Sequence, residues 1–194
     1  MLVLPRAHER SDTTVVFSGY HENGLITRIA DADHAIGAWH NIVIAIWRKR
    51  THLDGIALLK DYIEERAKLH KQLGLLQIIE DNASPPDPFA RKALAKMHLE
   101  HALLINRSAV VYAKQGFAGA TARAIITGVA MLNPPKFEHQ IFASIPSALQ
   151  WLYVDRTGTK GPGALDTLSQ AVGLLRSLET FTPASSKSRE LKRR

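Results

Sequence analysis

The sequence predicts an α/β fold built on a mixed, mostly parallel sheet of about five strands with helices packed on it. Strand-like and helix-like segments alternate through the middle of the chain, an order that produces parallel strands joined by helices. Two strand-like segments near the start flank an Asn23-Gly24 turn, a pattern typical of a β-hairpin. The run 73–79 is almost wholly apolar, as expected of a strand in the middle of a sheet.

Strands are expected where β-branched, aromatic and aliphatic residues cluster. The two hairpin strands are predicted at 13–20 and 25–30. Segment 31–39 is ambiguous and is interpreted as a short helix carrying Ile36 and Trp39. The remaining strands are predicted at 41–47, 73–79, 108–113 and 137–143.

Helices are expected where apolar residues recur at helical spacing. Segment 51–71 begins with Thr51 and Asp54 in a capping-box-like arrangement, and its residues Glu64, Glu65, Arg66 and Lys68 are expected to face mostly outward. A helix from Pro88 to about Leu104 should begin at Asp87, which can accept from free backbone N–H groups, and Pro at the first position loses no hydrogen bond. Its predicted inner stripe is Phe89, Ala93, Leu94, Met97, His101 and Leu104. Further helices are predicted at 120–132, 146–153 and 165–178.

The chain is divided by composition into a flexible N-terminus (1–12), an α/β domain (13–155), a linker with an amphipathic helix (156–182) and a disordered basic tail (183–194). The tail holds +4 of the net charge of +7, so the body is only mildly basic. The amphipathic helix either packs on its own body or a symmetry mate, or binds a partner's groove.

Composition narrows the classes of function. The chain has no cysteine, which excludes disulfides, thiolate metal sites and Cys nucleophiles. No apolar run approaches the roughly 18 residues that span a bilayer, and the N-terminus has no apolar signal core. A cytoplasmic protein is therefore expected.

The first candidate site follows strand 73–79. Asp81, Ser84, Asp87 and Arg91 lie where partner and ligand sites tend to occur, at the carboxyl end of a strand. They could receive a partner or a regulatory phosphate near a helix N-terminus. The alternative is ordinary loop chemistry with a helix cap. A catalytic pair of Glu80 and Asp81 is not expected, because adjacent strand residues point to opposite faces.

The second candidate site is the turn between strand 108–113 and helix 120–132. Backbone N–H groups around Gly116 and Gly119, with Thr121 and Arg123, could hold an anion. The alternative is a turn glycine with small residues for close packing. The nucleotide-binding patterns Gly-Lys-Ser/Thr and Gly-x-Gly-x-x-Gly are absent.

Two further clusters receive structural interpretations. His98 and His101 are three residues apart on a helix, but no third ligand is evident, so no metal and no cofactor are expected. Arg48-Lys49-Arg50 and the basic tail could contact nucleic acid or acidic lipid; the usual interpretation is a solvated surface.

The element order and the Asp87-Pro88 helix start resemble the STAS-like domains, the family of the bacterial anti-sigma-factor antagonists. The resemblance covers roughly 13–152 and includes Gln-Gly-Phe-Ala-Gly before a helix, then Ile141-Phe142-Ala143-Ser144 and Ala148-Leu149-Gln150-Trp151-Leu152. It implies a non-enzymatic signalling module that docks other proteins through one helix and the adjacent strand ends. In the antagonists, a Ser that opens the second helix is phosphorylated; only Ser84 could have that role here.

These observations predict a cytoplasmic regulatory module that docks a protein partner through the Asn82–Arg91 turn and helix. Two alternatives stay open: a protein that binds a small anion or lipid-like ligand at Gly116–Arg123, and contact with nucleic acid through the basic tail. A homodimer is a further alternative for the assembly.

Overall fold

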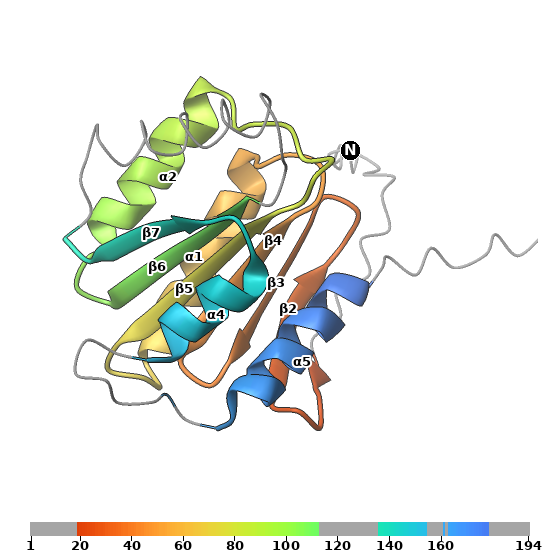
Figure 1. The fold of residues 1–194 in the computed structure, drawn as a ribbon. Coiled ribbons are helices and arrows are strands. Elements are labelled where there is room, and N and C mark those ends of the chain that lie inside the picture. The colour runs from red at the N-terminus through yellow and green to blue at the C-terminus, as the bar shows by residue number, and fades with distance from the viewer. Residues whose placement is uncertain (1–18, 113–135, 155–160, 162, 179–194) are drawn as a thin grey trace, which may run out of the picture.

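A seven-stranded sheet runs through the described part of the chain, and its strands lie side by side in the order of the sequence. The computed structural model describes residues 19–112, 136–154, 161 and 163–178 (Figure 1). The strands are β1 (Gly19–Tyr20), β2 (Leu25–Ala30), β3 (His34–Trp39), β4 (Ile42–Trp47), β5 (Leu73–Ile79), β6 (Ile105–Tyr112) and β7 (Glu138–Phe142). The helices are α1 (Leu53–Ala67), α2 (Pro88–Glu100), α4 (Ile145–Tyr153) and α5 (Leu165–Ser177).

The sheet has an antiparallel half and a parallel half. Strands β1 to β4 pair antiparallel, and β4 to β7 pair parallel. The predicted α/β class with a mixed sheet is confirmed, as is the hairpin at Gly24, whose φ of 82° suits glycine. The predicted number of strands was too low, and the sheet is less parallel than expected, because segment 31–39 adds an antiparallel strand rather than a helix.

Strand β3 is the main correction to the predicted elements. Only Ile36 and Trp39 among its six residues favour strands, yet all six are buried between two neighbouring strands and two helical layers. Asp31 turns the chain into β3, since its carboxylate accepts from the backbone N–H groups of Asp33 and His34 at 2.8 and 2.7 Å. Tertiary pairing therefore overrides the local preference for helix.

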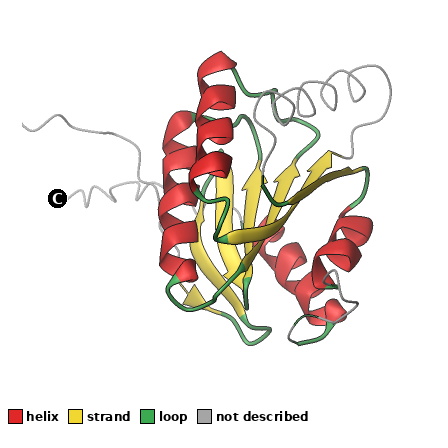
Figure 2. Cartoon of the chain, turned by 90° about the vertical axis from the view of Figure 1, so that its left-hand side faces the viewer, coloured by secondary structure: helices red, strands yellow, loops and turns green. Residues whose placement is uncertain are grey.

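The helices form one layer on each face of the sheet, as Figures 1 and 2 show. Helices α1 and α2 pack on a cluster that includes Val43, Leu75 and Ile105, and α4 and α5 pack on a cluster that includes Ile44 and Leu76. Successive residues of β4 and β5 alternate between these clusters, as the period-two geometry of strands requires. Both faces of the central strands are therefore buried, which explains their nearly continuous apolar runs.

Helix α5 packs on the body of the protein, the first of the two alternatives that the sequence left open. Its buried residues Leu168, Ala171, Val172 and Leu175 belong to the same cluster as Ala35 and Trp39 of β3. A Cβ on Gly37 would lie 2.8 Å from the Ile26 carbonyl oxygen and 3.2 Å from Leu175. The absence of a side chain at Gly37 therefore permits the close approach of α5 to the sheet.

Two details at the ends of α1 differ from the prediction. The N-cap is His52 rather than Thr51, and its Nδ1 accepts from the Gly55 N–H at 3.2 Å. Arg66, expected to face outward, is buried and donates to the His40 carbonyl oxygen at 2.8 Å. His40 has a φ of 49° in the turn between β3 and β4, so Arg66 stabilises a strained turn that local sequence does not reveal.

Several predicted segments lie outside the described residues: the N-terminus and strand residues 1–18, the second candidate site and helix within 113–135, most of the linker, and the basic tail. The predictions about them stay predictions. Among the described helices, none is long and apolar enough to cross a membrane.

Candidate docking surface

The four parallel strands end at the same edge of the sheet, and the first candidate site lies at the middle of this edge. Strand β5, which precedes the site, pairs with β4 on one side and β6 on the other. The connection after β4 is 48–52, and the one after β5 is 80–87. The site is therefore flanked by the basic residues that follow β4.

The backbone of the 80–87 turn is firmly held. The Ala83 N–H donates to the Glu80 carbonyl oxygen at 2.9 Å, and the Ala83 side chain is buried. The Ser84 N–H donates to the Lys49 carbonyl oxygen at 2.5 Å, and Ser84 forms an isolated parallel bridge with Arg50. This turn is thus an extension of the sheet rather than a free loop.

The turn ends in the helix start that the sequence predicted. Asp87 is the N-cap of α2, and its carboxylate accepts from the Ala90 N–H at 2.8 Å. Pro88 follows inside the first turn of the helix. The anchored backbone presents the side chains of Asp81, Ser84 and Asp87 on the surface, while Arg91 is half-buried. The four predicted residues lie within 81–91, with Asp81 and Ser84 in the turn, Asp87 at the N-cap and Arg91 near the start of α2.

Phe89 extends this surface, although the sequence assigned it to the inner face of α2. Its side chain is 74% exposed. The rest of the predicted stripe is confirmed, because Met97 and His101 are buried and Ala93, Leu94 and Leu104 pack against the core cluster. Phe89 thus adds a large apolar contact beside the exposed Ser84 and Asp87. The sequence missed it because Phe89 fits either helical face when only spacing is considered.

Charged pairs connect the site to α5 and to the β2–β3 turn. Arg176 of α5 binds both carboxylate oxygens of Glu80 at 2.7 Å. Lys49 pairs with Asp33 at 3.6 Å. Glu80 is therefore held by Arg176, whose pKa is raised mainly by the hydrogen bond to Glu80.

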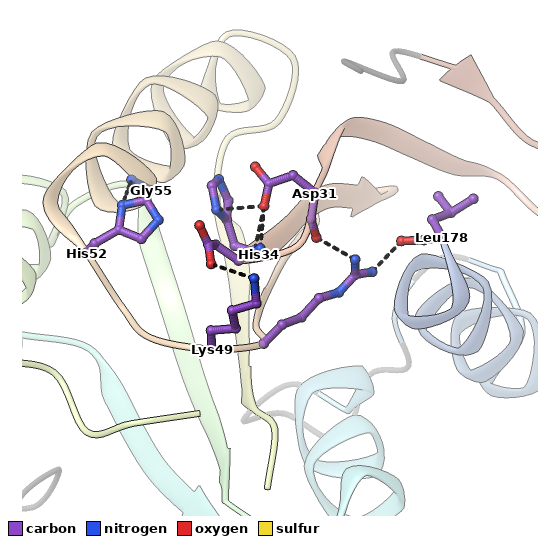
Figure 3. Close-up of polar contacts among 8 residues, drawn as sticks. Asp31, His34, Lys49, His52, Gly55 and Leu178 are labelled. Carbon is purple, nitrogen blue, oxygen red and sulfur yellow. Dashed lines mark hydrogen bonds and ion pairs between the residues drawn. The ribbon is translucent and has the colours of Figure 1, made fainter. Parts of the chain in front are cut away.

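Arg48 has a structural role that the sequence did not reveal, because the 48–50 run was interpreted as a solvated basic surface. Its guanidinium donates to the carbonyl oxygen of Asp31 at 2.6 Å and to that of Leu178 at 2.5 Å (Figure 3). It also donates to Leu175 and Arg176 carbonyl oxygens at 3.2 Å. The carbonyl groups of Leu175, Arg176 and Leu178 lie at the C-terminal end of α5, where the last carbonyl groups have no partner within the helix. Arg48 therefore caps α5.

The predicted pair His98 and His101 does not converge on a common point. The His101 ring nitrogens lie 2.8 Å from the Met97 carbonyl oxygen and 3.0 Å from Glu64 Oε1. His98 is buried instead beside Gln77, whose amide nitrogen lies 3.4 Å from His98 Nε2. Burial, with smaller contributions from His139 and His101, lowers the pKa of His98 to about 4. Within the residues that the structure describes, no cluster of three or more His, Cys, Asp or Glu side chains could hold a metal ion.

The fold is an α/β domain with a mixed seven-stranded sheet, and a hydrogen-bonded, exposed turn follows β5. No protein-family model matches the chain, and no curated protein matches it. In structure, the chain is similar to an uncharacterized protein of the DUF3478 family with a SpoIIAA-like fold from Shewanella loihica PV-4. The two are 16% identical, with a TM-score of 0.44, over 66% of this chain and 94% of that chain. This similarity concerns the fold and carries no function.

Proposed function

We propose that this chain is a non-enzymatic regulatory module that docks a protein partner through residues 82–91. The observation that carries the proposal is the contrast between an anchored backbone and outward side chains in this segment. The Ser84 N–H donates a hydrogen bond to the Lys49 carbonyl oxygen, and the Asp87 carboxylate caps α2. Phe89, by contrast, is 74% exposed. A rigid segment loses little conformational entropy on binding, which favours affinity.

The chemistry of the segment indicates the kind of partner. Phe89 offers a large apolar contact, and the exposed Ser84 and Asp87 offer polar contacts around it. Protein interfaces commonly combine a central aromatic anchor with a polar rim. The partner is therefore expected to present an apolar pocket for Phe89, bordered by hydrogen-bond donors that face Asp87.

Affinity capture from the native host tests the proposal, using the intact chain beside two substituted chains. The first carries Ser84→Ala, Asp87→Asn and Phe89→Ala. Asn at an N-cap still accepts the helix hydrogen bond, so α2 should remain intact while the docking chemistry is removed. The second carries Leu103→Ala, which removes another exposed apolar side chain outside the docking segment.

A partner retained by the wild type and the Leu103 variant, but lost by the triple variant, supports the proposal. The captured protein is then purified and titrated, and Phe89→Ala alone should weaken its binding by at least about tenfold, as expected for an aromatic anchor. Circular dichroism must show that each variant is folded. Equal binding by the folded triple variant contradicts the proposal.

A further inference from the structure

A buried histidine, His34, opens β3 and pairs with Trp47 at the end of β4. The imidazole of His34, the first residue of β3, is 3% exposed. Its Nδ1 lies 3.3 Å from Asp31 Oδ1, close enough for an ion pair, but its orientation forms no hydrogen bond. Within the described residues, neither ring nitrogen of His34 has a hydrogen-bond partner. The imidazole is therefore buried, and no hydrogen-bond donor or acceptor fixes its orientation.

Titratable and charged groups from three other segments act on His34, and Figure 3 labels Asp31 and His52 among them. Asp31 and Asp33 belong to the β2–β3 turn, Arg48 follows β4, and His52 caps α1. The His34 and His52 rings are 5.3 Å apart and perpendicular. Burial lowers the pKa of His34 below its ordinary value, and this effect outweighs the opposing attraction of Asp31.

A series of hydrogen bonds connects the backbone of His34 to the 80–87 turn, which carries Ser84. Asp31 Oδ1 already accepts two backbone N–H groups, those of Asp33 and His34. The Asp33 carbonyl oxygen accepts from the N–H groups of Arg48 and Lys49, at 2.8 and 3.4 Å. The Lys49 carbonyl oxygen accepts from the Ser84 N–H at 2.5 Å. The β2–β3 turn thus holds Arg48 and Lys49 at the end of β4, and Lys49 holds Ser84.

We propose that protonation of His34 reshapes the Asp31–Asp33 turn and, through Lys49, changes the position of Ser84 on the docking surface. Protonation gives the ring a donor on each nitrogen. A buried imidazolium requires a charged partner, and Asp31 is the carboxylate in reach. The present approach of Nδ1 to Oδ1 at 3.3 Å forms no hydrogen bond, so the Asp31 carboxylate, which also holds two backbone N–H groups, has to turn toward the ring and shift the Asp31–Asp33 turn. The inference rests on the proposed function, because it concerns regulation of the same surface.

Amide and imidazole resonances of the isolated protein test this coupling by NMR, from about pH 8, above the ordinary titration of histidine, down to the pH at which the protein unfolds. We expect the Lys49 and Ser84 amide shifts to change with the same midpoint as the His34 ring. In His34→Gln this change should disappear. His21→Gln, at the opposite end of β2, is the matched control and should leave it unaltered.

Asp31→Asn provides a second, independent readout. Asn keeps the oxygen that accepts the two backbone N–H groups but removes the charge that raises the pKa of His34. The midpoints of His34, Lys49 and Ser84 should therefore move together to lower pH. This variant also decides the question if His34→Gln does not fold.

Three results would overturn the inference: Lys49 and Ser84 amides that stay constant while His34 titrates, an amide change that persists in His34→Gln, or unfolding of the protein before His34 titrates. None of these measurements involves a partner. Failure of the coupling therefore leaves partner docking to be judged by the capture experiment, and failure to capture a partner leaves the coupling intact.

Discussion

The guanidinium of Arg176 in α5 binds both carboxylate oxygens of Glu80, the first residue after β5, at 2.7 Å. This ion pair joins the last described helix to the strand end that carries the docking turn. The two residues are far apart in the sequence, and their pairing makes α5 part of the framework around the candidate surface. The contribution of this ion pair to the free energy of unfolding depends on how far solvent screens the two charges.

Removing the Arg176–Glu80 pair should cost little stability. Both side chains are partly exposed, and solvent screening reduces such pairs to a coupling of about 0.5 to 1 kcal/mol even with bidentate geometry. A double-mutant cycle with Arg176→Ala and Glu80→Ala, measured by urea unfolding, gives this value. The more exposed pair of Lys96 and Glu100 is the control and should give a smaller coupling. A coupling of several kcal/mol would show that the pair is effectively buried.

Arg48→Ala should destabilise the protein more than loss of the surface pair. The substitution leaves the carbonyl oxygens of Asp31 and of the α5 end without their charged donor. Hydrogen bonds to charged groups contribute about 1.5 to 3 kcal/mol, so a loss in that range is expected on urea unfolding. Hydrogen exchange should show the largest loss of protection in α5. Arg48→Lys should recover only part of the stability, because one ammonium cannot reproduce the forked geometry. Full recovery would contradict the capping role.

Two glycine substitutions should change stability in opposite directions. Gly37→Ala places a Cβ 2.8 Å from the Ile26 carbonyl oxygen, which should cost about 1 to 3 kcal/mol through overpacking between the sheet and α5. Gly173→Ala, on the exposed face of α5, meets no atom within 4 Å and should stabilise the helix by about 0.5 to 1 kcal/mol. Thermal unfolding of both variants measures these effects. A tolerated Gly37→Ala would show that α5 is not closely packed on β3.

Acid should destabilise the folded state through the buried histidines. The pKa of His98 is lowered to about 4 by burial, whereas an unfolded histidine titrates near about 6.5. The neutral form is therefore favoured by folding, so the contribution to stability is complete above the unfolded pKa and is lost as the pH falls toward the folded pKa. The full difference corresponds to about 3 kcal/mol.

Unfolding free energies measured between about pH 7.5 and pH 4.5 test this expectation. In His98→Gln the dependence on pH should become shallower, because the side chain no longer titrates. Some dependence should remain, since burial also lowers the pKa values of His34, His70 and His139. An unchanged slope in a folded His98→Gln protein would show that His98 is not enclosed as described.

The elements that the sequence predicted well depend on local chemistry. The Asp87-Pro88 start of α2 was predicted because the cap involves neighbouring residues. The Asn23-Gly24 hairpin was predicted because the turn requires a positive φ. The continuous apolar runs of β4 and β5 were predicted as strands because burial on both faces leaves no room for polar residues.

The tertiary structure decided what depends on distant neighbours. Strand β3 exists because β2 and β4 pair with it on either side, and Phe89 is exposed because the first turn of α2 packs on the core through Ala90. Arg48 caps a helix end some 130 residues further along the chain. The order of helices and strands was thus determined by short-range patterns in the sequence. Which side chains the candidate surface exposes was decided only by folding, because contacts between distant segments set the direction of each side chain.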